Sequence, residues 1–325
     1  MSRRPDGEET PKRRPPTRAE FEARAQATRH DIEAQMRATK AQLDATQAKI
    51  EERTGRNLVA AIAIGLALGG LLLVSLLIFT WLFIIFGAVL VGFTVFELSS
   101  ALRFAGRDVP RIASTVVGVA VVPAAFYFHI EGLWLATLVA IAIITIYRLV
   151  ELIRPSHRTS VRAVASDLAA GAFVQLYVTF MAGFYVVLTG EQGGQWWTLA
   201  GIIIVVATDV GAYATGLSFG KHPMAPTIST KKTWEGAAGA AAAALIAGTL
   251  LGIFLLQEPW WVGVFLGAAL MVVATGGDLL ESLIKRDLGI KDISTWLPGH
   301  GGFLDRLDSI LPAAAVTYVF FLVFG

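Results

Sequence analysis

A short segment between two apolar runs, residues 277–308, holds several carboxylates beside basic side chains. Asp278, Ser282 and Lys285 are spaced i, i+4 and i+7, which places a carboxylate, a hydroxyl and an ammonium group on one face of a helix. Asp305 and Asp308 follow a Pro-Gly pair and lie one turn apart near the start of a final helix, where the helix dipole stabilises negative charge. Carboxylates interleaved with cations suit a divalent metal ion bound together with phosphate groups. The alternative is a network of surface ion pairs.

Residues 216–236 form a second polar segment, which combines glycines with basic and hydroxyl side chains. Glycine lets a ligand approach the backbone closely, and ammonium and hydroxyl groups donate hydrogen bonds to phosphate oxygens. The segment lacks the G-x-x-x-x-G-K-S/T frame of a Walker loop, so anion binding and an ordinary basic loop both remain open. The candidate donors are Lys221, Ser229, Thr230, Lys231, Lys232 and Thr233.

Asp209 is a lone carboxylate within an apolar stretch. It lies about ten residues, or roughly 15 Å, from the predicted cytoplasmic end of that stretch. An unpaired carboxylate inside a bilayer costs several kcal/mol, so this residue needs a partner or a function. Asp209 therefore either lines a cavity or binds a ligand, or it hydrogen-bonds to a neighbouring helix.

The composition of the chain predicts the elements that must position these side chains. Of the 325 residues, 55% are hydrophobic and 16% charged, against roughly 25% charged in a soluble domain. An apolar run of 39 residues, 58–96, is long enough for two membrane spans of roughly 20 residues each, with a turn near Thr80 and Trp81. Seven further apolar blocks bring the total to about nine transmembrane helices, so we expect an all-α polytopic integral membrane protein. These blocks are residues 112–128, 132–150, 163–189, 196–219, 236–256, 260–280 and 303–324.

The basic residues orient these spans. With the N-terminus in the cytoplasm, all 14 basic residues that follow residue 56 lie in or beside cytoplasmic loops. The opposite turns carry the charges of Glu131, Glu191 and Glu258, and this asymmetry is typical of the positive-inside rule. We therefore expect a multi-pass protein of the cell (inner or plasma) membrane with a cytoplasmic N-terminus, an outward C-terminus and both polar segments facing the cytoplasm. The 14 residues are Arg103, Arg107, Arg111, Arg148, Arg154, Arg158, Arg162, Lys221, Lys231, Lys232, Lys285, Arg286, Lys291 and Arg306.

Residues 1–56 form a charged extension that precedes the apolar body, residues 57–325. The extension holds 13 of the 27 Lys and Arg residues. Residues 1–17 are rich in proline and charge and are expected to be disordered, whereas residues 18–54 carry a weak apolar stripe at helical spacing. We expect a cytosolic extension that is disordered and then helical, and that is solvated, self-associating or partner-binding. The net charge of +2 gives no indication of nucleic-acid binding, and the absence of cysteine excludes disulfides and thiolate chemistry.

Residues 282–308 fit one long pattern at every fixed position: S-x-x-K-R-x4-K-D-x-S-x2-L-P-x-H-G-G-F-x-D-R-L-D. This pattern is the signature of the phosphatidate cytidylyltransferases, or CDP-diacylglycerol synthases, which the chain therefore resembles. Residues 205–236 also resemble that family but carry Thr230 where proline is usual, which leaves the loop less rigid and removes no ligand. The resemblance is strong over residues 205–310, general over the preceding spans and absent from the N-terminal extension.

The resemblance implies that CTP and phosphatidic acid condense to CDP-diacylglycerol and pyrophosphate at the cytoplasmic membrane face, for phospholipid biosynthesis. Phosphatidate is already ionised and can act as the nucleophile, so the site must hold two polyanions in line and neutralise the departing pyrophosphate. By resemblance, Asp278 and Asp305 hold Mg²⁺, with K⁺ as a monovalent ion that can lie beside it. The implied partners are the two substrates, the lipid bilayer and a second copy of the chain in a homodimer.

The resemblance also assigns roles to single residues. The implied catalytic set is Asp278, Lys285, Asp305 and Asp308. The implied phosphate clamps are Lys231, Lys232, Lys285, Arg286, Lys291 and Arg306, whereas Asp292, His300 and Asp308 orient those groups and Asp209 lies on the polar floor of the cavity. The full expected substrate-binding set is Asp209, Lys221, Ser229, Lys231, Lys232, Ser282, Arg286, Lys291, Asp292, His300 and Arg306.

Three other functions remain open on the sequence. A polyprenol or phytol kinase-like enzyme also joins CTP to a lipid but transfers the terminal phosphate to an alcohol. A transporter with a polar midplane site commonly shows two repeated halves, and no internal repeat is visible in this chain. A non-catalytic membrane scaffold would act through the N-terminal helix.

Overall fold

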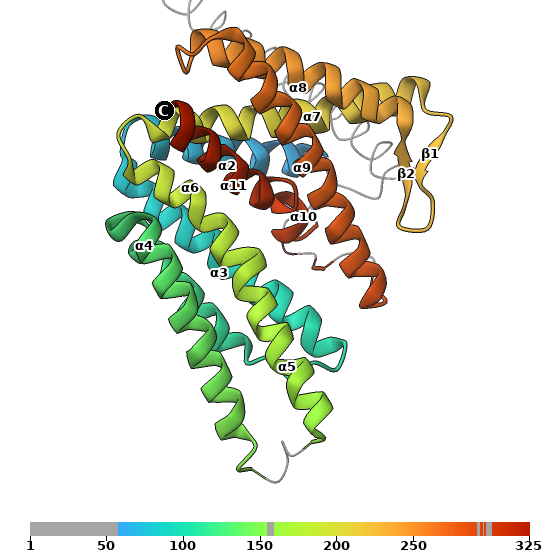
Figure 1. The fold of residues 1–325 in the computed structure, drawn as a ribbon. Coiled ribbons are helices and arrows are strands. Elements are labelled where there is room, and N and C mark those ends of the chain that lie inside the picture. Colours follow the sequence, from blue (N-terminus) through green and yellow to red (C-terminus); the bar gives the residue numbers. More distant parts are fainter. Residues whose placement is uncertain (1–57, 155–158, 291–292, 295, 297–300) are drawn as a thin grey trace, which may run out of the picture. The chain divides into compact units, whose positions relative to one another are not determined.

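The structure is a computed structural model that describes residues 58–154, 159–290, 293–294, 296 and 301–325. The described part is built almost entirely of helices (Figure 1). The expected N-terminal extension lies outside the described residues, as do Lys291, Asp292 and His300. The elements are α2 (Leu58–Leu77), α3 (Thr80–Phe104), α4 (Arg111–Glu151), α5 (Val161–Val174), the π-helix η2 (Gln175–Phe180), α6 (Met181–Gly190), α7 (Gly194–Phe219), β1 (Pro223–Ala225), β2 (Ser229–Thr233), α8 (Trp234–Phe254), α9 (Trp260–Asp287), α10 (Leu304–Leu307) and α11 (Ile310–Phe324).

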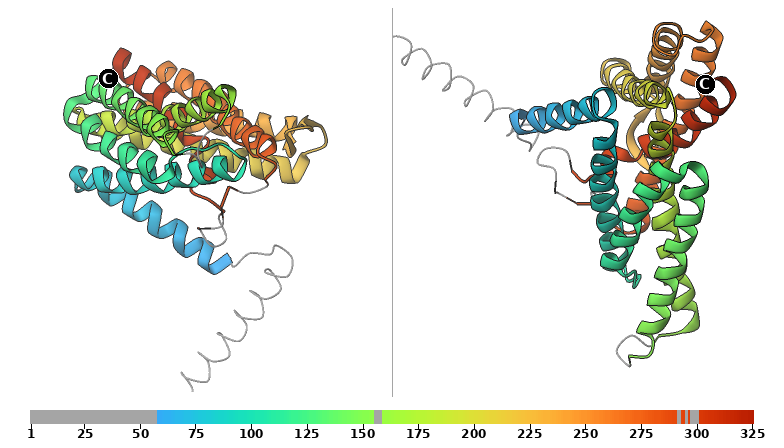
Figure 2. Two further views of the ribbon diagram at one scale, coloured as in Figure 1. Left: turned by 90° about the horizontal axis from the view of Figure 1, so that it is seen from below. Right: turned by 90° about the vertical axis from the view of Figure 1, so that its left-hand side faces the viewer.

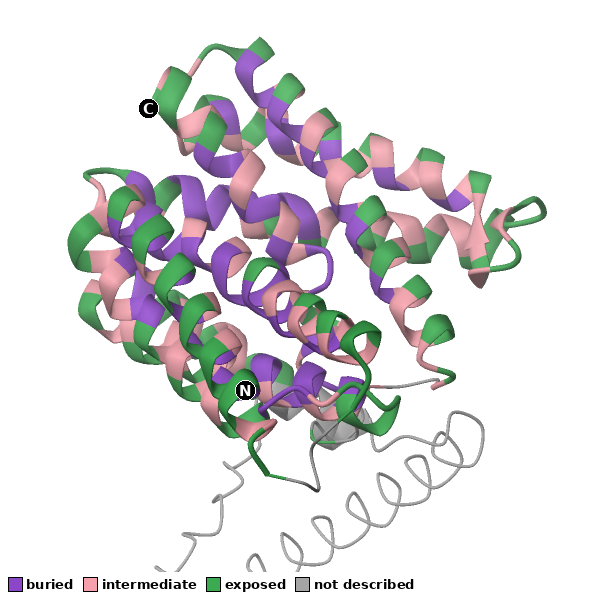
Figure 3. Ribbon diagram, turned by 60° about the horizontal axis from the view of Figure 1, so that its bottom comes forward, coloured by how far each residue is buried: buried purple, intermediate pink, exposed green. Residues whose placement is uncertain are grey.

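Seven helical segments in the described part are long and apolar enough to cross a membrane, and Gly65–Leu77 is a shorter apolar helix. Large apolar side chains such as Leu135 in α4, Val210 in α7 and Phe265 in α9 are exposed, as side chains that face lipid tails must be. Figure 3 shows exposed and buried faces alternating along the helices. These findings confirm an all-α polytopic membrane protein, whereas the count of nine spans and the cytoplasmic N-terminus stay predictions.

Helix α4 holds two of the expected apolar blocks. Its 41 residues would extend roughly 60 Å as one helix, about twice the hydrocarbon thickness of a bilayer. His129 interrupts the helix with φ 52° and ψ −142°. Gly132 must lack a side chain, because a Cβ there would overlap the carbonyl oxygen of Ala124. The chain therefore reverses at His129, between the predicted blocks 112–128 and 132–150.

In two places, loops that the charge pattern assigns to the same membrane face contact each other in the structure. The buried guanidinium of Arg148, at the end of α4, lies 2.8 Å from Asp167 of α5 and 3.3 Å from Asp108, which follows α3. These three residues belong to loops expected on one membrane face. His129 and Glu191, from turns expected on the opposite face, lie 2.9 Å apart. Loops predicted for the same face therefore meet each other in the fold.

Small residues bring α7, α8 and α9 close together (Figure 2). A Cβ on Gly248 of α8 would overlap the carbonyl oxygen of Gly263 in α9, and one on Gly239 of α8 would overlap Thr215 of α7. Lipid tails are as apolar as leucine, so close backbone packing replaces the hydrophobic effect as a source of helix association in a membrane. This packing fixes α9, which carries the first part of the signature segment.

The hairpin formed by β1 and β2 departs from the all-helical expectation. The two strands are antiparallel, with Pro223 opposite Thr233 and Ala225 opposite Ser229. They lie within residues 216–236, which the sequence predicts only as a loop, because strands this short cannot show a clear alternating pattern. The Thr233 hydroxyl then caps α8 by accepting a hydrogen bond of 3.1 Å from the backbone N–H of Gly236.

Candidate active site

The charged side chains of the two polar segments meet beside the C-terminal half of α9. The Lys285 Nζ of α9 lies 2.9 Å from Asp305 Oδ1 of α10, and the Lys232 Nζ of β2 lies 2.8 Å from Asp278 Oδ2 of α9. Arg286 adds a hydrogen bond of 3.3 Å from its Nε to the carbonyl oxygen of Ile228, which directly precedes β2. Two segments that lie far apart in the sequence therefore form one charged cluster.

The polar face of α9 agrees with the predicted spacing. The Ser282 hydroxyl lies 3.5 Å from Asp278 Oδ1 one turn away. The Lys285 ammonium group is shared between Asp305 and Glu281, whose Oε2 lies 2.5 Å from it. Glu281 is fully buried and was not among the predicted site residues. It fixes the position of the lysine, because a buried carboxylate and its cation are costly to separate.

The turn that leads into α10 is built around Asp305. Gly301 has a φ of 84°, a conformation that favours glycine, and the backbone N–H of Gly302 donates a hydrogen bond of 2.7 Å to Asp305 Oδ2. The other carboxylate oxygen of Asp305 accepts from Lys285. Asp305 therefore joins the turn to α9, and Asp308 follows one helical turn later, as predicted.

Asp308 lies where α9 and the final helical segment approach most closely. Its side chain is buried, and Oδ1 accepts a hydrogen bond of 2.6 Å from the backbone N–H of Ser309. A Cβ on Gly277 of α9 would overlap the Asp308 carbonyl oxygen. The Asp308 carboxylate also interacts electrostatically with Asp278 and Asp209. The close approach at Gly277 therefore brings the Asp308 carboxylate within electrostatic range of Asp278 and Asp209.

Asp209 of α7 belongs to the same cluster. Its carboxylate interacts electrostatically with Asp278, Lys232 and Arg306. This position explains how a carboxylate in an apolar helix is tolerated, because two cations lie within range of its charge. The structure thus brings Asp209 to the charged cluster, where the sequence expected a polar cavity floor.

The basic residues in and beside the hairpin differ in whether their side chains reach the carboxylates of the cluster. Three predicted donors form no side-chain hydrogen bond or ion pair with the residues that the structure describes: Lys221, Ser229 and Lys231. The backbone N–H groups of Lys221 and His222 instead donate to Glu235 in the first turn of α8, at 3.1 and 3.2 Å. Lys232 is the hairpin lysine whose ammonium group reaches the carboxylates, and it also lies 3.4 Å from the carbonyl oxygen of Thr275.

Glu97 of α3 was missed by the sequence reasoning, which ended a charge-free span at residue 96. Its side chain is 2% exposed and accepts hydrogen bonds from the backbone N–H groups of Phe303 and Leu304, at 3.2 and 2.8 Å, and from the Ser294 hydroxyl. A Cβ on Gly302 would overlap this carboxylate. A carboxylate within an apolar helix was itself a signal, because its burial must be compensated.

The carboxylates fit Mg²⁺ in type. Among the residues that the structure describes, no three His, Cys, Asp or Glu side chains gather as a metal site. Mg²⁺ is usually held by one or two carboxylates and completes its coordination with water and substrate phosphates. The Asp278 side chain is 37% exposed and the Asp305 side chain 10%, so Asp278 is the more accessible ligand. The oxygens of Asp305 already accept hydrogen bonds but retain further lone pairs.

Apolar helices that meet around a cluster of carboxylates, lysines and an arginine define a membrane protein with a polar site that suits phosphate groups. A family model described as the cytidylyltransferase family matches residues 59–324. The chain therefore belongs to the cytidylyltransferase family, and it is an enzyme of the nucleotidyltransferase class. The charged N-terminal extension lies outside the matched residues.

The chain is similar to three proteins named phosphatidate cytidylyltransferase. With that of Mycobacterium tuberculosis it shares 38% identity over 275 residues, which cover 82% of this chain and 83% of the relative. With that of Mycobacterium leprae it shares 38% identity over 277 residues, covering 82% of this chain and 88% of the relative. With that of Brucella suis it shares 40% identity over 158 residues, covering 48% and 57%. The family resemblance stated from the signature residues is therefore confirmed.

Proposed function

We propose that this protein transfers CMP from CTP to phosphatidic acid, forming CDP-diacylglycerol and releasing pyrophosphate. The observation that carries the proposal is the meeting of Lys232, Lys285 and Arg306 with several carboxylates at the ends of apolar helices. Such a site suits one polyanionic substrate from water and another from lipid. The names of the similar proteins support the same reaction.

The reaction balances without an added base. An oxygen of the phosphatidate phosphate attacks the α-phosphorus of CTP, and a new P–O bond forms. The bond between the α-phosphorus and the oxygen that bridges to the β-phosphorus breaks, and its electron pair leaves with pyrophosphate. Because the attacking oxygen is already ionised, the protein's task is to align two polyanions and compensate their charge.

The lysines are held in place before substrate arrives. An ammonium group has three donors, and Lys285 uses two of them on Glu281 and Asp305. Lys232 is held in the same way by Asp278 and the Thr275 carbonyl oxygen. Each lysine thus retains a donor for a phosphate oxygen, at a position that its other contacts fix.

Asp278, together with Asp305, would hold Mg²⁺, which supplies neutralisation of phosphate charge when bound. The remaining carboxylates then have separate tasks. Asp308 and Glu281 position the cations around the ligands, and Asp209 balances the charges of Lys232 and Arg306. K⁺ beside the magnesium ion stays a prediction.

The site is proposed to face the cytoplasm of the cell membrane. The support is the sorting of basic residues by the positive-inside rule and the meeting of same-face loops around Arg148. CTP is then available from the cytosol and phosphatidate from the adjoining leaflet. A homodimer is also proposed on the family resemblance, and the mass of the detergent-solubilised protein tests it.

The reaction is tested with the purified full chain, phosphatidate, Mg²⁺ and CTP labelled at the α-phosphate. We expect the label to enter a lipid that migrates as CDP-diacylglycerol. A second reaction with CTP labelled at the γ-phosphate should place its label in pyrophosphate.

The same assay separates the main alternative. A lipid kinase would leave the α-label in CDP and move the γ-label into lipid. That result would overturn the proposed reaction, because the two mechanisms break different phosphoanhydride bonds.

A further inference from the structure

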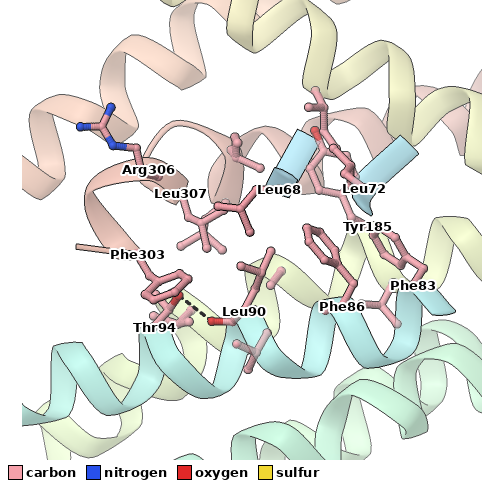
Figure 4. Close-up of a pocket in the computed structure, with 18 of the residues that line it drawn as sticks. Leu68, Leu72, Phe83, Phe86, Leu90, Thr94, Tyr185, Phe303, Arg306 and Leu307 are labelled. Carbon is pink, nitrogen blue, oxygen red and sulfur yellow. Dashed lines mark hydrogen bonds between the residues drawn. The ribbon is translucent and has the colours of Figure 1, made fainter. Parts of the chain in front are cut away.

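A partly open apolar cavity of about 270 Å³ lies beside the charged cluster. Figure 4 shows side chains of α2, α3 and the α10 segment pointing into it. Its wall includes Leu68, Leu72, Phe86, Leu90, Phe303 and Leu307. The volume exceeds that of an engineered cavity of about 150 Å³ that binds benzene, so the cavity has room for an aliphatic chain.

The wall of the cavity offers almost no polar contacts. The hydroxyl of Thr94 is directed away from any ligand, because it donates a hydrogen bond of 2.7 Å to the carbonyl oxygen of Leu90 (Figure 4). A cytosine ring or a ribose would lose hydrogen bonds to water here without replacement. An alkyl chain has no hydrogen bonds to lose here, and it makes dispersion contacts with the carbon surface of the wall.

One helical segment separates the cavity from the charged cluster. Phe303, Arg306 and Leu307 line the cavity, and their spacing of three and four residues places them on one helical face. Asp305 lies between them in the sequence and Asp308 follows them directly, and both aspartates take part in the charged cluster instead. The cavity and the cluster therefore lie on opposite sides of the same short helical segment.

Arg306 connects the two regions. Its side chain is part of the cavity wall, and Figure 4 shows the guanidinium group directed out of the cavity. The same guanidinium interacts electrostatically with Asp209 of the cluster. A long basic side chain commonly places its carbon stem on apolar surface and its charge in a polar region. A lipid with an anionic head group likewise combines an apolar part, its acyl chains, with a charged part, its head group.

We propose that this cavity binds one acyl chain of the phosphatidate substrate, with the lipid phosphate on the Arg306 side of the segment. The proposal rests on the proposed function and names the subsite that its lipid substrate would use. CTP then occupies the charged cluster, and the two substrates approach the reacting position from opposite sides of the α10 segment.

Two adjacent glycines of α2 allow a matched test. Gly69 lines the cavity, whereas Gly70 is exposed and is not part of its wall. A Cβ at either position would meet no atom within 4 Å, so both positions accept a larger residue. Gly69→Leu fills part of the cavity, and Gly70→Leu makes the same change in helix propensity without filling it.

We expect Gly69→Leu to lower kcat/KM for dioleoyl phosphatidate by about tenfold or more, since the added side chain and a long acyl chain compete for the same space in an apolar site. The value for dihexanoyl phosphatidate should change less than about twofold on the same reasoning, because short chains bury few methylenes in the cavity. Gly70→Leu should leave both values near those of the unmodified protein. Equal effects of the two substitutions, or equal losses with both lipids, would overturn the acyl-chain subsite.

A binding measurement separates this proposal from the reaction itself. Vesicles that contain the full chain are given phosphatidate with a photoreactive diazirine near the end of one acyl chain. We expect labelled peptides from α2 and α3 in the unmodified protein and in Gly70→Leu, and several-fold less labelling in Gly69→Leu. Labelling of this kind without CDP-diacylglycerol formation would refute the reaction and retain the subsite. CDP-diacylglycerol formation together with equal labelling of all three proteins would support the reaction and overturn the acyl-chain subsite.

Discussion

At the scale of single residues, the site pairs its cations with carboxylates before any substrate is present. Lys285 lies between Glu281 and Asp305, and Lys232 lies against Asp278. Removing one member of a buried pair leaves the other charge without compensation. Substitutions at this site therefore act on stability as well as on chemistry, and each test must separate the two.

Asp278→Asn should abolish most turnover. The asparagine keeps the size of the side chain but lacks the charge that a metal ion requires, and loss of one preorganised electrostatic group costs about 100-fold or more. The control is Asp287→Asn, an exposed carboxylate at the end of the same helix, which should retain activity. Turnover is measured across a Mg²⁺ titration. Near-normal rates of Asp278→Asn at ordinary Mg²⁺ would refute its assignment as a metal ligand.

Lys285→Ala should destabilise the protein as well as weaken phosphate binding. It leaves Glu281, which is 1% exposed, without its cation, and such a loss costs about 3 kcal/mol. The double substitution Lys285→Ala/Glu281→Gln removes the charge of Glu281, the more buried of the two carboxylates that Lys285 contacts, and should recover part of the lost stability. Thermal unfolding of both proteins in detergent measures the difference. A double variant that is no more stable than Lys285→Ala alone would contradict the pairing of Lys285 with Glu281.

At the scale of elements, the site depends on contacts between helices that are distant in the sequence. Glu97 ties α3 to the turn before α10, and Gly277 lets α9 meet the Asp308 backbone. The hairpin of β1 and β2 brings Lys232 across to α9. Each of these contacts joins a mostly apolar helix to a polar group of another element.

Glu97→Ala should loosen the turn that holds Asp305. The substitution removes the acceptor of two buried backbone N–H groups, each worth about 1–3 kcal/mol when left unsatisfied. We expect a lower unfolding temperature and at least a severalfold loss of kcat, with Glu97→Gln intermediate because its amide oxygen still accepts. Ser100→Ala on the same helix is the control, since that hydroxyl donates to its own helix at Phe96. Identical behaviour of Glu97→Ala and Ser100→Ala would show that the contact positions nothing.

At the scale of the whole molecule, the predicted topology places the site and the basic residues that follow residue 56 on one membrane face. The ends of α3, α4 and α5 meet around Arg148, and the turn at His129 meets the turn at Glu191. The chain contains no cysteine, so single introduced cysteines report on membrane orientation without a background.

A cysteine at Gln192, in the turn before α7, should react with a membrane-impermeant maleimide in intact cells. A cysteine at Arg154, after α4, should react after the membrane is permeabilised. Both positions are exposed, so a difference reports the membrane face rather than burial. The reverse pattern would place the site on the outer face and contradict the positive-inside assignment.

Deletion of residues 1–55 should leave turnover within about twofold, because the charged cluster and its supporting contacts lie in the described residues after Leu58, and salt screens charges outside that cluster. Membrane insertion of the shortened chain is verified first by its fractionation. Complete loss of turnover in an inserted protein would assign the extension a catalytic or scaffold role.

The sequence by itself determined the features that depend on local chemistry. Long apolar runs indicate membrane helices, basic loops indicate orientation, and the signature from Ser282 to Asp308 indicates the family. The helical face of Asp278 and Ser282 also follows from spacing alone. These features need no knowledge of how the helices pack.

The tertiary structure decided which distant residues meet. Glu97 and Glu281 gain their importance from contacts with Leu304 and Lys285, and the hairpin exists only because two very short strands pair. The cavity beside Arg306 is formed by helices whose apolar residues look alike in the sequence. Because these helices are apolar around most of their surface, hydrophobic periodicity does not encode their neighbours, and close packing at glycines and single polar contacts select the arrangement.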